Sequence, residues 1–364
     1  MNENDKQPQM RVPFTDLINL ASERVGTLAL SASDEFFAKK ENLLKEDAPL
    51  FMADQYTEQG KWMDGWESRR KRNLSPENNH DWCVIQLGLP GVIRGVDVDT
   101  SFFTGNYPEY CSIEAMAVAM GVSMSESKSE IVGKTTEKSI STDFKWKEIL
   151  PKVRLQGGMS NLFPISSTEK WSHLRLKIFP DGGVARLRVY GEVLPDWEKM
   201  MNSNELFDFA AAAHGAQVIT CNDMFFGKKD NLILPGRARN MGEGWETRRR
   251  RGPGHDWLIV QLAHSAKLVK LEVDTNHFKG NYPESCSVEG CVYPKRDLLP
   301  SDFRDRTDLQ WTEILPRTKL QPNVQHFFEN ELKQKEMERS FDYLRLNIFP
   351  DGGISRFRAY GKVE

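Results

Sequence analysis

The chain contains one sequence pattern twice, and the segments that recur most closely are polar and turn-like. Four phrases return in the same order: Gly-Trp-Glu-Ser-Arg-Arg at 65–70 as Gly-Trp-Glu-Thr-Arg-Arg at 244–249, His-Asp-Trp at 80–82 and 255–257, Gly-Asn-Tyr-Pro-Glu at 105–109 and 280–284, and Ile-Phe-Pro-Asp-Gly-Gly at 178–183 and 348–353. A duplicated fold has to keep only its apolar pattern, because cores accept hydrophobic exchanges of similar volume. Identical polar residues at turn-like positions therefore indicate either a required backbone geometry or a binding site.

The duplication predicts two domains, in agreement with the length of 364 residues. We expect a disordered tail over 1–13, a first repeat over 14–193, a linker over 194–206 and a second repeat over 207–364. Between the Asn-Tyr-Pro phrase and the next tryptophan, the first repeat has 40 positions and the second has 30. The excess falls around 123–141, a tract rich in Ser, Thr, Lys and Glu that predicts an exposed loop.

The apolar residues of both repeats mostly recur with a period of two, which indicates half-buried strands. Residues 174–178 and 344–348 alternate in this way. Helical signal is confined to short stretches near 16–23, 208–213 and 329–340. Each repeat ends with a strand, Pro-Asp-Gly-Gly and a second alternating strand, which predicts a hairpin. The predicted fold is all-β, with two jelly-roll-like β-sandwiches in tandem.

Charge and cysteine usage narrow the class of protein. Lys and Arg number 49 and Asp and Glu number 52, so no overall field favours nucleic acid or an anionic membrane. The five cysteines show no Cys-x-x-Cys spacing, and Cys83 lies in an apolar run that predicts a buried, reduced thiol. No apolar run approaches the ~18 residues of a membrane span, and the polar N-terminus fits no export or transit signal. We expect a soluble, cytoplasmic protein with neither a nucleic-acid nor a membrane partner.

Two arginine pairs are candidates for binding an anion. Arg186 and Arg188 are two positions apart on a predicted strand, as are Arg356 and Arg358, so each pair projects from one face of a sheet. Planar guanidinium groups bind carboxylates in a bidentate manner, which predicts a substrate clamp. The alternative is a solvated outer face with ordinary ion pairs.

The Trp-Glu phrase combines an aromatic residue, an acid and two arginines. Its glutamate, Glu67 or Glu246, is a candidate for proton transfer, and Arg70 or Arg249 is a candidate for binding substrate. The structural alternative is that the tryptophan closes the mouth of the sandwich while the glutamate pairs with a local arginine. The sequence does not decide between them.

His80 and His255 each precede an acid and a predicted strand. A histidine with a near-neutral pKa can give or take a proton, which makes both catalytic candidates. A histidine bonded to the backbone at the start of a strand is an equally good interpretation. No His-x-His or His-x-x-x-His pair indicates a metal site, so no cofactor is predicted with certainty and a divalent metal stays an alternative.

The Asn-Tyr-Pro phrase favours a functional interpretation. A turn accounts for its glycine and proline, but not for the rest of the phrase. The amides of Asn106 and Asn281 each offer a donor and an acceptor, which suits an amide or ureido group. Glu109 and Glu284 add carboxylates nearby and are candidates for acid-base chemistry.

Taken together, these phrases resemble the allantoicase family. The match spans almost all of 14–363 and rests on Ser-Asp-Glu-Phe-Phe-Ala at 33–38, Asn-Leu-Leu at 42–44, Lys-Trp-Met-Asp-Gly-Trp-Glu-Ser-Arg-Arg at 61–70, His-Asp-Trp at 80–82, Thr-Gly-Asn-Tyr-Pro at 104–108, Glu-Ile-Leu-Pro at 148–151 and both Phe-Pro-Asp-Gly-Gly endings. The resemblance implies two galactose-binding-like jelly rolls, a homo-oligomer, and an amidinohydrolase that converts allantoate and water to ureidoglycolate and urea in purine breakdown. The second repeat departs from the pattern at 223–227, and Glu243 stands at the place of Asp64, which leaves open whether both repeats are catalytic.

With allantoate as substrate, the candidate residues take definite roles. The arginine pairs would hold the carboxylate, and Asn106 and Asn281 would bind a ureido arm. A glutamate or histidine would protonate the departing urea nitrogen while another group directs water. Two other functions remain open: a non-catalytic tandem module that binds carbohydrate or protein, and a regulatory protein that keeps the fold without the activity.

Overall fold

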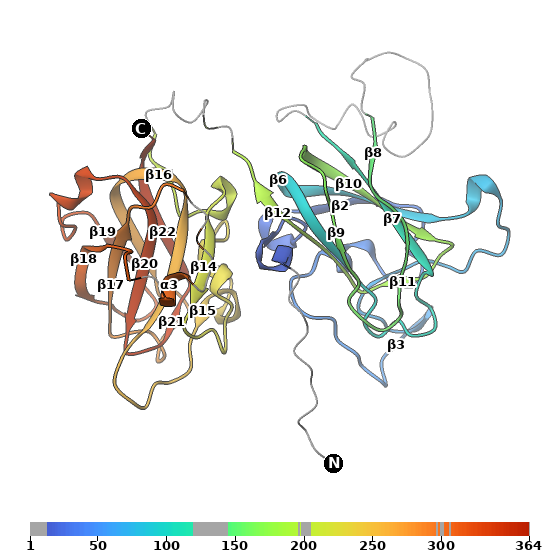
Figure 1. Cartoon of the computed structure of the whole chain (residues 1–364). Helices are drawn as coiled ribbons and strands as arrows, with labels where there is room; N and C mark the ends of the chain where they lie inside the picture. The colour runs from blue at the N-terminus through green and yellow to red at the C-terminus, as the bar shows by residue number, and fades with distance from the viewer. Residues whose placement is uncertain are drawn as a thin grey trace. The chain divides into compact units, whose positions relative to one another are not determined.

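The structure is a computed structural model that describes residues 13–118, 145–195, 197, 205–295, 298, 302–305 and 307–363. The chain divides into two compact units, residues 1–194 and 195–364. The predicted tail except Pro13, most of the predicted linker and the predicted loop at 123–141 lie outside the described residues. Figure 1 shows that the regular secondary structure of each unit consists mainly of strands.

The first unit is organised around one long strand. Its strands are β1 (Ile18–Asn19), β2 (Leu28–Ala32), β3 (Tyr56–Thr57), β4 (Gly60–Lys61), β5 (Trp66–Glu67), β6 (Asp81–Asp99), β7 (Tyr110–Met116), β8 (Lys147–Arg154), β9 (Leu162–Pro164), β10 (Lys170–Phe179), β11 (Gly183–Val184) and β12 (Arg186–Val193). The first half of β6 pairs with β2 and β10, and β10 continues to β7 and β8. The second half of β6 pairs with β12 and β9, and β12 pairs with β1. Strand β6 therefore belongs to both layers of the unit.

The second unit repeats this topology. Its strands are β13 (Phe207–Asp208), β14 (Gln217–Cys221), β15 (Trp245–Glu246), β16 (Asp256–Asp274), β17 (Ser285–Cys291), β18 (Trp311–Lys319), β19 (Gln325–Phe328), β20 (Phe341–Phe349), β21 (Gly353–Ile354) and β22 (Arg356–Val363). The order β13-β22-β16-β20-β17-β18, with β14 and β19 also on β16, matches that of the first unit strand for strand. The prediction of two tandem all-β domains is confirmed.

The period-two pattern places the core between the layers. In β10 the alternating residues Leu174, Leu176 and Ile178 are fully buried. The intervening Arg175 and Lys177 lie on the outer face. Full burial of one such aliphatic side chain stabilises a fold by about 1.5–3 kcal/mol. In β20 the residues Leu344, Leu346 and Ile348 are likewise fully buried, and Asn347 between them is buried as well.

The predicted closing hairpin is wrong. Strand β10 pairs with β6 and β7, whereas β12 pairs with β6 and β1, so the two strands flanking Pro-Asp-Gly-Gly are not partners. The phrase instead carries the chain from one layer to the other, and its short strand β11 pairs with β5. Gly182 has a φ of 138°, and a Cβ at Gly183 would lie 2.0 Å from the ring of Phe103. Both glycines are therefore required by backbone geometry and close packing.

The stretches with helical signal form no α-helix: they contain strand β1, the end of β13 and the short 3-10 turns η1 (Pro13–Asp16), η2 (Glu23–Val25), η5 (Ala212–His214) and η8 (Glu336–Glu338). Further 3-10 turns lie elsewhere, at η3 (Lys40–Leu44), η4 (Pro76–Asn78), η6 (Lys229–Ile233) and η7 (Met241–Glu243). A short α-helix, α3 (Asp302–Asp305), lies in the second unit. None of the predicted stretches is long enough to offset the cost of helix nucleation. No helix in the described ranges could cross a membrane, and all five cysteines are free, with Cys83 buried.

Candidate active site

Three of the recurrent phrases meet in each unit. Asn106 Nδ2 donates a hydrogen bond to Glu67 Oε1 at 2.7 Å, and Asn281 Nδ2 donates to Glu246 Oε1 at 2.5 Å. The Pro-Asp-Gly-Gly phrase joins them, because Gly183 pairs with Glu67 and donates its N–H to the Asn106 carbonyl at 2.8 Å. The Glu–Asn pair of each unit is therefore fixed by three segments that are far apart in the sequence.

The Glu67 carboxyl is held in a partly desolvated position. Its backbone is bridged on one side by Ala38 and on the other by Gly183. Burial raises the pKa of Glu67 above its ordinary value, and the hydrogen bond from Asn106 opposes this only in part. Its protonated form therefore persists to a higher pH than that of an exposed glutamate.

The Glu–Asn pair of the second unit adjoins a surface pocket of about 500 Å³. The pocket is lined by Arg239, Asn240, Met241, His277, Lys279, Gly280 and Asn281. Lys279 is exposed and has no hydrogen-bond or ion-pair partner among the residues that the structure describes. Arg239 forms an ion pair with the buried Glu243 at 2.5 Å. The pocket thus brings an unpaired ammonium group close to an amide that is fixed by a carboxylate.

The corresponding positions of the first unit have different chemistry. Alignment on the Asn-Tyr-Pro phrase places Thr104 opposite Lys279 and Phe102 opposite His277. Phe102 and His277 share the same left-handed backbone, with φ of 70° and 72°. Phe102 stacks on Phe51 at 5.5 Å between ring centroids. The first unit therefore has an aromatic contact and a hydroxyl where the second has an imidazole and an ammonium.

In each His-Asp-Trp phrase the aspartate is buried and the histidine is half-buried. The His80 ring packs on that of Phe179 with 5.3 Å between the ring centroids, and the His255 ring packs on that of Phe349 with 4.6 Å between the centroids. His255 Nε2 lies 3.2 Å from Asn347 Oδ1. Burial, and then the positive charge of Lys177, Lys71 and Arg175, lowers the pKa of His80. No hydrogen bond joins either histidine to the Glu–Asn pair in the described part of the chain.

The arginine pair of the first unit contacts protein groups and not an open surface. Arg186 is 1% exposed and forms an ion pair with Asp64 at 2.6 Å. It also donates to the main-chain carbonyls of Asp64 and Asp47. Arg188 donates to the Glu46 carbonyl at 3.0 Å. Both arginines thus fix the segment that leads into the Trp-Glu phrase, which differs from the predicted clamp and from a solvated face.

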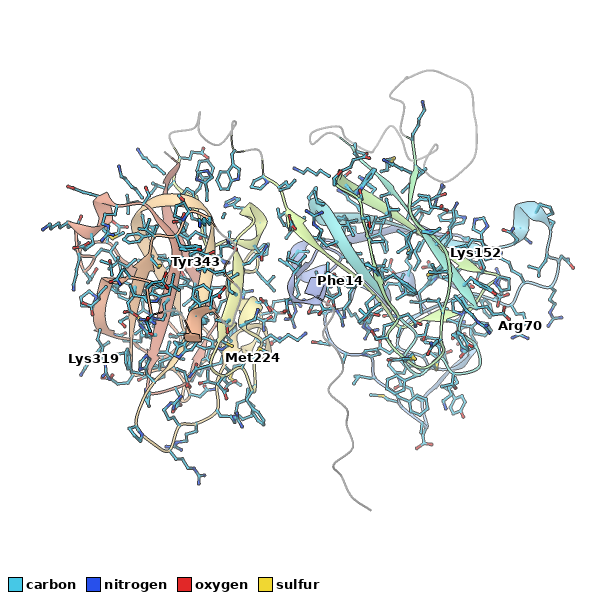
Figure 2. All side chains as sticks on the ribbon, in the orientation of Figure 1. Phe14, Arg70, Lys152, Met224, Lys319 and Tyr343 are labelled. Carbon is cyan, nitrogen blue, oxygen red and sulfur yellow. The ribbon has the colours of Figure 1, made fainter. Side chains whose placement is uncertain are left out.

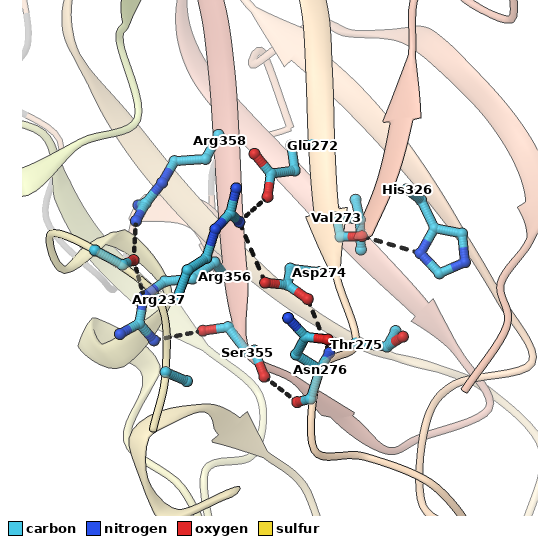
Figure 3. A network of polar contacts seen from close by, with 12 residues as sticks. Arg237, Glu272, Val273, Asp274, Thr275, Asn276, His326, Ser355, Arg356 and Arg358 are labelled. Atoms are coloured by element: carbon cyan, nitrogen blue, oxygen red, sulfur yellow. Dashed lines mark hydrogen bonds and ion pairs between the residues drawn. The ribbon is translucent and has the colours of Figure 1, made fainter. Parts of the chain in front are cut away.

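The second pair has the same structural position. Arg356 donates to the carbonyls of Gly236 and Glu243, and Arg358 donates to that of Leu234 at 2.5 Å. Figure 3 shows these arginines beside Arg237, which pairs with Glu272 and, at 3.2 Å, with Asp274. Buried polar groups need such partners, and here the carbonyls of a loop supply them.

The remaining candidates lie apart from the Glu–Asn pairs. Glu109 is exposed, and Glu284 Oε2 forms an ion pair with Arg317 on β18 at 3.1 Å. Hydrogen bonds from Ser285 and Arg317 lower the pKa of Glu284. Arg70, labelled in Figure 2, is exposed, and Arg249 lines a different pocket. Neither glutamate is hydrogen-bonded to a Glu–Asn pair within the described ranges.

Sequence reasoning missed Lys279, His277 and Arg239. Lys279 immediately precedes the second Gly-Asn-Tyr-Pro phrase, but its counterpart in the first repeat is a threonine. Because Lys279 is not shared by the two repeats, the recurrence of polar residues gave no signal for it. Across the described residues, no group of three or more His, Cys, Asp or Glu side chains is arranged to hold a metal ion.

Comparison with known proteins agrees with this duplicated architecture. The family model described as the allantoicase repeat matches residues 18–194 and 207–364. The chain is 43% identical over 358 residues to an allantoicase of Dictyostelium discoideum, covering 98% of this chain and 89% of that protein. It is 44% identical over 352 residues to a probable allantoicase of Pseudomonas fluorescens, covering 97% and 98%. The crystal structure of an allantoicase from Saccharomyces cerevisiae aligns with a TM-score of 0.76 at 32% identity, covering 96% of each chain. The chain belongs to the allantoicase family.

Proposed function

We propose that this protein is an allantoicase, an amidinohydrolase that converts allantoate and water to ureidoglycolate and urea in purine breakdown. Family membership supports the reaction. The observation that carries the location of the site is the Glu246–Asn281 pair next to Lys279 in the pocket of the second unit. We further expect a cytoplasmic homo-oligomer.

The pocket complements the substrate group by group. Allantoate carries one carboxylate and two ureido arms on a single carbon. The ammonium of Lys279 binds the carboxylate, and a hydrogen bond to a charged group contributes about 1.5–3 kcal/mol. The Asn281 amide nitrogen donates to Glu246 and also contacts Met241 Sδ at 3.9 Å, which leaves the amide oxygen for a ureido arm. The arginine pairs contribute indirectly, since they hold the segment before the Trp-Glu phrase.

The reaction requires a proton acceptor and then a proton donor at one carbon. Water adds its oxygen to the central carbon, and the bond from that carbon to one urea nitrogen breaks. We assign both proton steps to Glu246: it takes a proton from the water and gives it to the departing nitrogen, so that no net proton is gained or lost. The hydrogen bond from Asn281 holds the Glu246 carboxylate in place for both steps.

We assign the reaction to the second unit. The first unit has the same Glu–Asn pair, but Thr104 offers no positive charge at the position of Lys279. A monoanionic substrate is therefore bound more weakly there.

Incubation of the purified protein with allantoate tests the proposal directly. We expect urea to appear in step with the loss of allantoate and to saturate with substrate concentration. Repeating the assay after EDTA treatment, with and without added Mn²⁺, tests the divalent-metal alternative. Binding of allantoate or of sugars with no release of urea under any of these conditions contradicts the proposal and favours a non-catalytic module.

A further inference from the structure

A row of four basic residues follows the Trp-Glu phrase in the second unit. In this row, Arg248–Arg251, alternate residues have different environments. Arg248 pairs with Asp223 at 2.9 Å, and Arg250 pairs with the buried Asp256. Arg249 and Arg251 are exposed, and neither has a hydrogen-bond or ion-pair partner among the described residues. Arg248 and Arg250 are thus held by ion pairs, whereas the positive charges of Arg249 and Arg251 are not neutralised by a carboxylate among the described residues.

These arginines surround a polar pocket of about 280 Å³. Asp223 and Asp256 also line it, so four positive charges face two negative ones. The Nε atom of Arg250 is buried and has no hydrogen-bond partner in the structure as described. The pocket therefore holds two positive charges that no carboxylate in the described ranges neutralises, and a bound anion would neutralise them.

The Arg248–Arg251 pocket shares no lining residue with the pocket beside the Glu–Asn pair. The excess of two positive charges in the Arg248–Arg251 pocket favours anions that carry more than one negative charge. Allantoate carries a single carboxylate and would leave one guanidinium group uncompensated. A phosphate group carries about −1.5 to −2 charge at neutral pH and offers three acceptor oxygens. Guanidinium groups bind such oxygens in a bidentate, planar manner.

We propose that the Arg248–Arg251 pocket is a binding site for a phosphate group, supplied as inorganic phosphate or as a small phosphate monoester. Arg249 and Arg251 neutralise the two charges of the phosphate. Arg248 and Arg250 are held by their aspartates, so the site is largely preformed. The inference stands apart from the hydrolase proposal, because it concerns binding alone.

The first unit carries a related row, Arg69–Arg70–Lys71–Arg72, with the same anchoring. Arg69 pairs with Asp34 at 2.7 Å and Lys71 pairs with Asp81 at 2.9 Å. A second phosphate could therefore bind to the first unit and confuse a titration. The test uses the full-length chain with Arg70→Gln and Arg72→Gln, which leaves only the row of the second unit intact.

Isothermal titration calorimetry in a phosphate-free, low-salt buffer then measures binding of inorganic phosphate and of glycerol 3-phosphate. We expect one site per chain, weakened at least about tenfold by the added pair Arg249→Gln and Arg251→Gln, because charged hydrogen bonds are lost. The matched control, Arg317→Gln with Lys319→Gln, removes two exposed charges on β18 and should change binding little. The tighter of the two ligands identifies the free or the esterified form.

Three results would overturn the proposal: no binding of either phosphate, binding unchanged by the Arg249 and Arg251 substitutions, or equal weakening in the β18 control. Thermal unfolding confirms that each variant is folded. If the double substitution unfolds the chain, Arg251→Gln alone removes one exposed charge, and the same three results apply to it.

Discussion

The two units share a frame and differ in the residues around it. Each has the Glu–Asn pair, the glycine turn that crosses between layers and the buried arginines. Beside the pair, the second unit presents Lys279 and His277, whereas the first presents Thr104 and Phe102. The repeated residues thus set the backbone and supply a Glu–Asn pair in each unit. The neighbours that differ set the charge presented beside that pair.

The segment before the Trp-Glu phrase shows the same contrast. From the end of η3 to the glycine of the phrase there are 21 positions in the first unit, and from the end of η6 there are 11 in the second. The longer segment supplies Phe51, which stacks on Phe102. Both segments are held by buried arginines from the closing strand. One anchoring device therefore supports two different surfaces.

The sharpest test of this contrast exchanges one oxygen for nitrogen in each unit. Glu246→Gln should lower kcat by about 10²–10⁴-fold, the usual contribution of a general acid-base group. The matched change Glu67→Gln should leave kcat within a few-fold of wild type. Steady-state urea release measures both. An equal loss in the two variants would show that the first unit also takes part.

Stability tests the shared anchor. Arg186→Met removes one partner of a buried ion pair and leaves Asp64 with Lys45 as its remaining countercharge, which should lower the free energy of unfolding by about 3 kcal/mol, the low end of the cost of breaking a buried pair. Arg188→Met is the matched control, because Arg188 lies 3.9 Å from Glu46 and is less buried. Urea denaturation measures both. Similar losses in the two variants would mean that Asp64 is not the reason for the burial of Arg186.

A smaller effect is expected from Lys279, which corresponds to Thr104 in the first unit. Lys279→Thr gives the second unit the side chain of the first and should raise KM for allantoate about tenfold with kcat nearly unchanged, since a charged contact to the bound carboxylate is lost. Lys319→Thr makes the same chemical change on β18 and should have no effect. A fall in kcat with KM unchanged would contradict a role in binding.

The smallest effect concerns pH. Burial raises the pKa of Glu67 above its value in the unfolded chain, so the folded state binds its proton more tightly. Stability from this group is fully present below the unfolded pKa and is lost as the pH rises through the folded pKa. Thermal unfolding of wild type and Glu67→Gln is measured at pH 4 and pH 7. The unfolding temperature of the wild type relative to the variant should be lower at pH 7 than at pH 4. A difference in unfolding temperature that does not change with pH would exclude this titration.

The sequence predicted the fold well and the site in part. Period-two alternation identified the strands, because side-chain direction in a strand depends only on local geometry. The polar phrases also converge, as the pairing of Glu67 with Asn106 shows. The hairpin prediction failed because strand partners are set by tertiary packing, which Pro-Asp-Gly-Gly does not encode. The burial of Arg186 was likewise invisible, since the segment that covers it is distant in sequence.

Strands β6 and β16 make each unit indivisible. Each is 19 residues long, and its two halves belong to different layers. A break anywhere inside either strand would deprive both layers of a neighbour, so no smaller piece of the unit keeps all its hydrogen bonds. Gene duplication could then succeed only by copying the whole block. The two units keep the same long central strand, β6 or β16, and differ in the residues of their surfaces.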